Sequence, residues 1–275
     1  MNKRLIAAAA ALASIATSAS AADLPAKKAT PEPVGPPEWK GFYLGLDGGY
    51  DWSISNAIQQ DYLETLPGAF ATHAINGSLP TRSSVSRHGF IGGGQIGWNW
   101  SFGNYFLIGF ETDIQGLVGD DGSRTVFGSG TSTSFFKGLD NLGTARARLG
   151  YLFNPSLLLY GTAGLAYGEG VLDAGYYGTW LGQGLTDLQS TTLIGYSVGA
   201  GAEWRFLPQW SIKAEYLYYN LGSLQTQGAQ FNYKVAGVPA VSTAQSTARF
   251  DGSVVRLGLN YHFKWDDALK LIDLE

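Results

Sequence analysis

Apolar and polar residues alternate with a period of two in eight segments of the 275-residue chain. In the last segment Val255, Leu257 and Leu259 share one side, and Arg256 and Asn260 lie between them on the other. Since successive side chains of a strand point to opposite faces, each segment predicts a strand with one apolar and one polar face. The eight segments are Gly41–Trp52, Gly89–Trp100, Tyr105–Gln115, Leu142–Tyr151, Leu157–Gly168, Ile194–Phe206, Ser211–Asn220 and Ser253–Phe263.

Charged residues are absent from the apolar faces of all eight segments and gather on the opposite faces. The acids there are Asp47, Asp51, Glu111, Asp113, Glu203 and Glu215. The bases are Arg146, Arg148, Arg205, Lys213 and Arg256. An apolar outside around a polar inside is typical of barrels that cross a membrane. The fold alternative, a soluble lipocalin-like barrel, needs its charged face outward.

The connections between the segments alternate in length. Those at 101–104, 152–156 and 207–210 are tight turns that carry Gly, Asn or Pro. The long ones, rich in Ser, Thr, Gly and Gln, are Ser53–His88, Leu117–Leu139, Glu169–Leu193 and Leu221–Phe250. Bacterial outer-membrane barrels combine short periplasmic turns with long extracellular loops. We therefore predict an all-β fold, an eight-stranded antiparallel up-and-down transmembrane β-barrel with short periplasmic turns and four long extracellular loops.

Aromatic residues gather near both ends of the predicted strands, with mostly Leu, Ile, Val, Ala and Gly between them. Trp204 and Phe206, for example, lie beside a tight turn, and Tyr50 and Trp52 lie beside a long connection. Two aromatic girdles around an apolar band are typical of the two membrane–water interfaces of such a barrel. The pattern therefore indicates the outer membrane as the location of the protein.

The two ends of the chain have patterns of their own. Lys3 and Arg4, an Ala-rich apolar run and Ala19-Ser20-Ala21 predict a signal peptide that is cleaved between Ala21 and Ala22. Five prolines then predict an extended segment that cannot pair in a sheet. The predicted divisions are a signal peptide at 1–21, a Pro-rich periplasmic tether at 22–38, the barrel at 39–263 and a periplasmic tail at 264–275.

Several strand sequences carry a resemblance to a known family. They include Gly41-Phe42-Tyr43-Leu44-Gly45, Arg146-Ala147-Arg148-Leu149-Gly150-Tyr151 and Val255-Arg256-Leu257-Gly258-Leu259-Asn260-Tyr261. These strands resemble the small outer-membrane immunogenic protein and porin-family barrels of alphaproteobacteria. The resemblance implies an eight-stranded barrel in the cell outer membrane, with a structural or envelope-integrity and surface-antigen role.

One departure from the family lies at the C-terminus. In the family, the terminal aromatic residue of the last strand lies at or near the chain end, where the barrel-assembly machinery reads it. By this resemblance Tyr261 and Phe263 are the assembly-signal aromatics, yet residues 264–275 follow them. The expected partners are the barrel-assembly machinery together with outer-membrane lipid and lipopolysaccharide. A net charge of −4 without runs of like charge predicts no nucleic-acid partner.

The charged faces allow two interpretations. An eight-stranded lumen is only wide enough to be filled by side chains, and buried charges must pair. Six acids against five bases nearly balance and predict a structural network of ion pairs. The alternative is that these residues line a narrow passive porin for small solutes. The sequence has no cysteine, no Ser-His-Asp spacing and no His-Glu-x-x-His motif, so we expect no enzymatic activity, no cofactor and no metal site.

Two further motifs have a functional and a structural interpretation. Gly92-x-Gly94-x-x-Gly97 matches the dinucleotide fingerprint, but no helical pattern follows it, which favours structural glycines in a strand. His73 and His88 lie in or beside the first long connection and are candidate ligands for haem iron or a metal. They support a third possible function, a surface protein that binds haemin or a host ligand.

Overall fold

The computed structural model describes residues 39–64, 79–178, 184–235 and 238–263, and these residues form strands joined by turns and irregular connections. The predicted signal peptide, tether and tail lie outside the described residues. In chain order the strands are β1 (Gly41–Ser53), β2 (Ala57–Glu64), β3 (Arg82–Ser84), β4 (His88–Phe102), β5 (Phe106–Asp120), β6 (Gly122–Gly128), β7 (Thr131–Leu139), β8 (Asn141–Asn154), β9 (Leu157–Gly178), β10 (Leu185–Arg205), β11 (Trp210–Gln225), β12 (Ala229–Val235) and β13 (Val238–His262).

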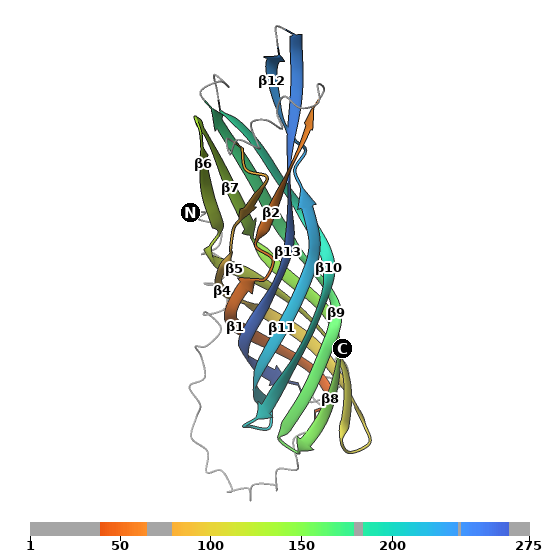
Figure 1. The fold of residues 1–275 in the computed structure, drawn as a ribbon. Helices are drawn as coiled ribbons and strands as arrows, with labels where there is room; N and C mark the ends of the chain where they lie inside the picture. The colour runs from red at the N-terminus through yellow and green to blue at the C-terminus, as the bar shows by residue number, and fades with distance from the viewer. Residues whose placement is uncertain (1–38, 65–78, 179–183, 236–237, 264–275) are drawn as a thin grey trace, which may run out of the picture. The chain divides into compact units, whose positions relative to one another are not determined.

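Within the described part of the chain, eight strands close into a barrel. They follow one another in the order β1, β4, β5, β8, β9, β10, β11 and β13. The ring closes because β13 pairs with β1, from Tyr43 opposite His262 to Ser53 opposite Gly252. All these pairings are antiparallel, and the strands run obliquely around the barrel (Figure 1). The predicted fold class is confirmed.

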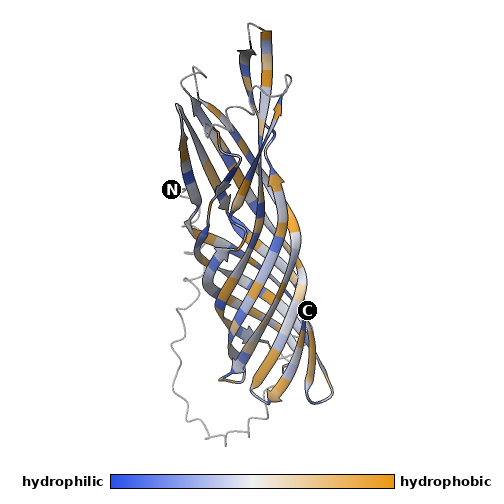
Figure 2. Ribbon diagram, viewed as in Figure 1, coloured by the Kyte–Doolittle hydropathy of each residue, from blue (hydrophilic) through white to orange (hydrophobic). Residues whose placement is uncertain are grey.

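The two faces of each barrel strand differ as the alternation predicts. Leu46 and Leu257 point outward and are 66% and 64% exposed, whereas Asp51 and Arg146 point inward and are fully buried. Hydrophobic and hydrophilic positions therefore alternate along the strands (Figure 2). The outward face is the one that lipid can cover, and the inward face holds nearly all the charge of the barrel.

The strands do not stop at the predicted strand ends on the side of the long connections. There they continue as a second β-structure, which we call the extension: 54–64, 79–87, 119–140, 169–178, 184–193, 221–235 and 238–251. Strands β9, β10 and β13 run into it without a break, while β2, β3, β6, β7 and β12 are its separate strands (Figure 1). The prediction that these four connections are loops is therefore wrong for much of their length.

The sequence hides these strands because their inward residues are small. On β13, Ala240, Ser242, Ala244 and Ser246 are buried, and every second residue between them is partly exposed. The inward positions alternate Ala with Ser, and the outward positions mix Val with Thr and Gln, so neither set is consistently apolar and the period of two has low contrast. A run rich in Ser, Thr and Gln is then easily taken for a loop.

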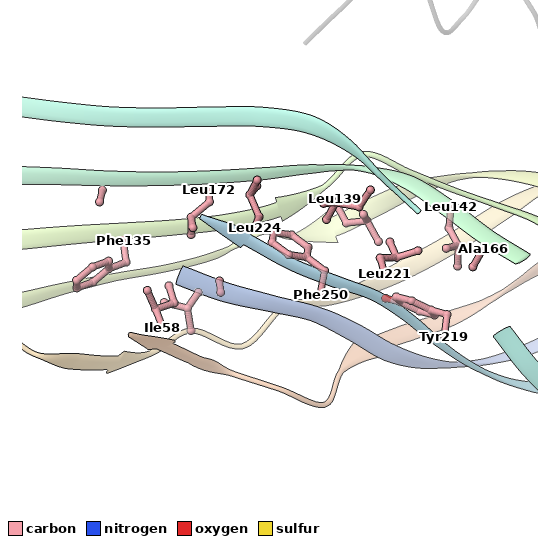
Figure 3. Close-up of a cluster of buried hydrophobic side chains, with 14 of the residues drawn as sticks. Ile58, Phe135, Leu139, Leu142, Ala166, Leu172, Tyr219, Leu221, Leu224 and Phe250 are labelled. Carbon is pink, nitrogen blue, oxygen red and sulfur yellow. The ribbon is translucent and has the colours of Figure 1, made fainter. Parts of the chain in front are cut away.

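An apolar core fills the extension and the upper end of the barrel. Phe135, Leu172, Leu224 and Phe250 belong to it and are each at most 5% exposed. Their side chains converge from strands that are far apart in sequence (Figure 3). The interior of the protein is thus apolar in the extension and charged in the part of the barrel nearer the short turns.

The aromatic residues of the four long connections have different environments. Phe135 and Phe231 are buried in the core, Phe136 is half-buried, and Phe127 is 79% exposed. Phe70 and Trp180 lie outside the described residues.

Among the residues that the structure describes, no helix has the length and hydropathy needed to cross a membrane.

Candidate functional site in the barrel lumen

Arg146 on β8 is at the centre of the lumen and is fully buried. Its Nη2 lies 2.6 Å from Glu111 Oε1 and 2.9 Å from Asp113 Oδ2, and its Nη1 lies 3.0 Å from Glu215 Oε1. These carboxylates come from β5 and from β11, so one guanidinium links three strands. A planar guanidinium with five N–H donors can bridge several carboxylates in this way, which a lysine ammonium does less well.

Arg256 on β13 joins the same carboxylates from the other side. Its Nε donates to Glu215 Oε2 at 2.6 Å, and its Nη2 lies 3.0 Å from Asp113 Oδ2. Its Nη1 lies 3.5 Å from Asp47 Oδ2, so the acid of β1 is included as well. The closing strand thereby binds both neighbours, β1 and β11, through its arginine.

Lys213 completes the central cluster. Its Nζ lies 3.0 Å from Glu111 Oε1 and also donates to Gln95 Oε1. Glu111 accepts a further hydrogen bond from the Tyr43 hydroxyl at 2.6 Å. The central cluster is defined as Asp47, Glu111, Asp113, Glu215, Arg146, Lys213 and Arg256.

A second cluster lies nearer the short turns. Arg148 donates from Nη2 to Glu203 Oε2, and the Arg148 guanidinium carbon lies 3.7 Å from the centroid of the Tyr160 ring. Glu203 also accepts hydrogen bonds from Asn260 Nδ2 at 2.8 Å and from Ser211 Oγ. His262 Nε2 lies 3.1 Å from Glu203 Oε1, which places the histidine inside this network. Every one of these groups is at most 5% exposed.

Trp39 closes the lumen at the end with the short turns. The indole is 3% exposed and its Nε1 donates to Pro155 O at 2.9 Å. The Arg205 guanidinium carbon lies 4.7 Å from the ring centroid, and the His262 ring meets it edge-on at 5.7 Å. Leu158 and Tyr160 pack with it in a small apolar cluster. The residue directly after the predicted tether is therefore a lid over the lumen.

Asp51, Arg87 and Tyr219 form a third cluster at the opposite end of the lumen. Arg87 Nη1 lies 2.6 Å from Asp51 Oδ2, and the Tyr219 hydroxyl donates to Asp51 Oδ1 at 2.8 Å. Arg87 Nη2 donates to the Tyr219 hydroxyl. Arg87 comes from the connection before β4 and turns into the lumen below the apolar core. Arg87 therefore supplies the positive charge that pairs with Asp51 of β1.

The structure thus places all eleven predicted lumen charges on the inside of the barrel, at three levels along it. All six acids contact a base of this set or Arg87, and Arg205 stacks on Trp39. Sequence reasoning missed Arg87 and Trp39. Each lies two residues before the start of a predicted strand, in line with the residues of that strand that point inward. Extending the alternation by two residues would therefore have identified both as lumen residues.

The glycines of the apparent dinucleotide fingerprint lie in the middle of β4. A Cβ at Gly97 would lie 2.3 Å from Tyr43 Cζ, so only glycine leaves room for the ring that donates to Glu111. No helix follows this strand in the described residues, because a turn leads directly to β5. Gly97 therefore serves packing in the lumen, whereas Gly92 is exposed on the outer face of the same strand.

The other candidate residues that the structure describes lie outside the lumen. His88 is exposed at the start of β4, with its ring 6.3 Å from Tyr50, and His73 lies outside the described residues. Among the described residues, no group of three or more His, Asp or Glu side chains is arranged to hold a metal ion. Phe263 is 42% exposed, and its ring lies 5.3 Å from that of Phe42 and 5.0 Å from that of Tyr261. Tyr261 and Phe263 are thus part of the outer aromatic surface.

The chain is similar to several known proteins. Residues 7–263 match the family described as "Outer membrane protein beta-barrel domain". The 31 kDa outer-membrane immunogenic protein of Brucella melitensis is 32% identical over 265 residues, which cover 91% of this chain and 96% of that protein. The 22 kDa outer membrane protein of Rhizobium leguminosarum bv. viciae is 32% identical over 195 residues, 70% of this chain and 68% of that one. Among solved structures, OprG of Pseudomonas aeruginosa has a TM-score of 0.40 at 12% identity, covering 82% of this chain and 97% of OprG.

Proposed function

The chain belongs to the outer membrane protein beta-barrel family and lies in the cell outer membrane, and from that premise we propose that it is a sealed structural barrel. In this role it supports envelope integrity and presents its extension at the cell surface as an antigen. The curated Brucella relative is called an immunogenic protein, which supports the surface-antigen part of the proposal. The proposal includes the absence of enzymatic activity and of a cofactor.

The observation that carries the proposal is the filling of the lumen at successive levels. Trp39 lies at the end with the short turns, the central cluster lies in the middle, and Asp51 with Arg87 lies at the far end. The apolar core of the extension lies beyond them. Moving an ion past these levels requires separating buried charge pairs, which is strongly unfavourable at low dielectric constant.

The alternative functions have less support. A narrow porin needs a continuous polar path through the lumen. Here the lumen charges contact one another instead, and a single side chain, Arg256, contacts Asp47, Asp113 and Glu215. Binding of haemin or a host ligand through His73 and His88 stays a prediction. His88 is exposed, and no second histidine is placed beside it by the described residues.

A deletion strain separates a structural barrel from a porin. We expect cells without the protein to admit more of a dye that an intact outer membrane excludes, and to take up small sugars and amino acids at an unchanged rate. Expression of the wild-type chain should restore dye exclusion. Slower solute uptake together with unchanged dye exclusion would contradict the proposal and favour the porin.

The expected partners fit this role. We propose that lipid and lipopolysaccharide surround the apolar band, and that the barrel-assembly machinery recognises Tyr261 and Phe263 despite the residues that follow them. Removing 264–275 and measuring the rate at which the heat-modifiable barrel forms in cells tests the second partner. Unchanged or faster assembly is expected, whereas loss of assembly would mean that the recognition signal lies in the tail.

A further inference from the structure

Three arginines lie on the outer surface of the extension. Arg82 belongs to β3, Arg124 to β6 and Arg249 to β13, and all three are exposed, Arg249 by 53%. Ser83 and Phe250, which adjoin Arg82 and Arg249 in sequence, are buried in the opposite direction, so these two arginines point away from the apolar core. Arg124 pairs with the buried Phe135 and shares its face of β6 and β7, but its side chain is exposed and extends toward β3.

Strand pairing places the three arginines near one another. Arg124 Nη1 lies 3.4 Å from the carbonyl oxygen of Ser84 on β3. Ser84 pairs with Ala57 on β2, and the next β2 residue pairs with Ala248 on β13, so Arg249 lies across β2 from Ser84. Neighbouring strands are about 5 Å apart, so the three guanidinium groups can reach a common area on the order of 10 Å across. We call Arg82, Arg124 and Arg249 the arginine cluster.

The arginine cluster lies just beyond the outer aromatic girdle. Trp52 of that girdle pairs with Ser253 on β13, and Arg249 is four residues further along the same strand. At roughly 3.3 Å per residue along a tilted strand, this places Arg249 about 10 Å above the girdle. That height corresponds to the headgroup layer of the outer leaflet, where phosphate groups lie.

The arginine cluster makes few ion pairs. Within the described residues neither Arg82 nor Arg124 has an ion-pair partner. Arg249 Nε lies 3.5 Å from Asp251 Oδ2, but that carboxylate already accepts hydrogen bonds from Ser55 N at 2.8 Å and Ser55 Oγ at 2.9 Å. Exposed acids on the extension include Asp61 and Asp121 near the cluster, and Asp140 and Glu169 on the β8–β9 side.

We propose that the arginine cluster binds the phosphate groups of lipopolysaccharide in the outer leaflet. The inference rests on the proposed lipid partner and names the residues that recognise it. Guanidinium groups form paired hydrogen bonds with phosphate oxygens, which is why arginine is favoured at phosphate sites. The apolar band below the cluster covers the acyl chains of the same molecule, and the cluster holds its charged end.

The test uses the full mature chain refolded in phosphatidylcholine bilayers and titrated with lipopolysaccharide at low salt. The triple variant R82Q/R124Q/R249Q should bind about a hundredfold more weakly, since each arginine near an anionic surface contributes about a fivefold change. The matched control D140N/E169Q removes exposed charges from the other side and should bind as the wild type does. Heat-modifiable migration verifies that each variant is folded. If the triple variant does not fold, the three single variants are measured instead, and each should bind about fivefold more weakly than the wild type.

Two further arms identify the ligand. Lipopolysaccharide whose phosphates have been removed should bind the wild type as weakly as intact lipopolysaccharide binds the triple variant. Vesicles that contain phosphatidylglycerol should compete poorly. Equal binding by the triple variant, equal binding of the dephosphorylated form, or equal competition by phosphatidylglycerol would each overturn the proposal. None of these outcomes depends on the dye-exclusion result, so the two proposals can fail separately.

Discussion

Replacing Arg146 by Met tests how the lumen charges hold the barrel together. The Arg146 guanidinium lies 2.6–3.0 Å from Glu111, Asp113 and Glu215, and it is fully buried. Removing one partner of a buried ion pair typically costs about 3–5 kcal/mol, because the other charge stays buried without compensation. Here each carboxylate keeps Arg256 or Lys213 as a neighbour. We therefore expect a loss of about 3 kcal/mol in the free energy of unfolding, the lower end of that range.

The assay is urea unfolding of the refolded barrel in lipid bilayers, followed by tryptophan fluorescence. In a double-mutant cycle with Glu215→Gln, the second substitution should cost less in the Arg146→Met background, with a coupling of about 1–3 kcal/mol. Lys40→Gln, which removes an exposed cation, should change stability by less than about 0.5 kcal/mol. Wild-type stability of Arg146→Met, or additive costs in the cycle, would refute the conclusion that this arginine compensates the three carboxylates.

Three other predictions follow from the outer face, the lid and the extension. Leu257→Arg places a charge on the lipid-facing band and should cost about 2–4 kcal/mol in the same bilayer assay, whereas equal stability would show that Leu257 does not face lipid. Trp39→Ala removes a buried indole and should cost about 3–5 kcal/mol, with Trp39→Phe in between; an unchanged unfolding midpoint would show that the lid adds no stability. Burial lowers the pKa of Lys137, which donates to Ser55 O and Arg249 O in the extension, to about 8. Between pH 8 and about 10.4, the usual pKa of lysine, the unfolded chain then binds more protons than the folded one, so the free energy of unfolding should rise with pH. The variant Lys137→Met should lose this rise, and equal pH dependence in the variant and the wild type would contradict the role given to Lys137.

Much of the barrel could be predicted because lipid and lumen impose opposite demands on successive residues. A charge in the part of the outward face that lipid covers is unfavourable, so the outward positions of the eight predicted segments are uncharged, and the inward parity of residues such as Glu111 and Arg146 can be read from the sequence alone. Their actual partners could not be read. Which carboxylate meets which base depends on the stagger between strands, and Arg256 contacts acids from three different strands.

The extension was missed for a different reason. Outside the membrane the surroundings are water, so an outward Thr or Gln and an inward Ser or Ala give little contrast. Lys137 shows a second difficulty, because the inward parity changes between β7 and β8. Leu139 and Leu142 are both buried, with Asp140 exposed between them. A period of two extended from Arg146 would therefore have placed Lys137 on the outer face.

Single-channel recording in planar bilayers tests the sealed lumen most directly. The refolded wild-type barrel is compared with a variant that carries Trp39→Ala, Arg87→Ala, Arg146→Ala and Arg148→Ala, which removes a large side chain from the lid and from each of the three clusters. We predict no reproducible conductance steps for the wild type and small, frequent steps for the variant. Stable steps from the wild-type barrel, at a size that these substitutions leave unchanged, would contradict the conclusion that the side chains of the lumen close it.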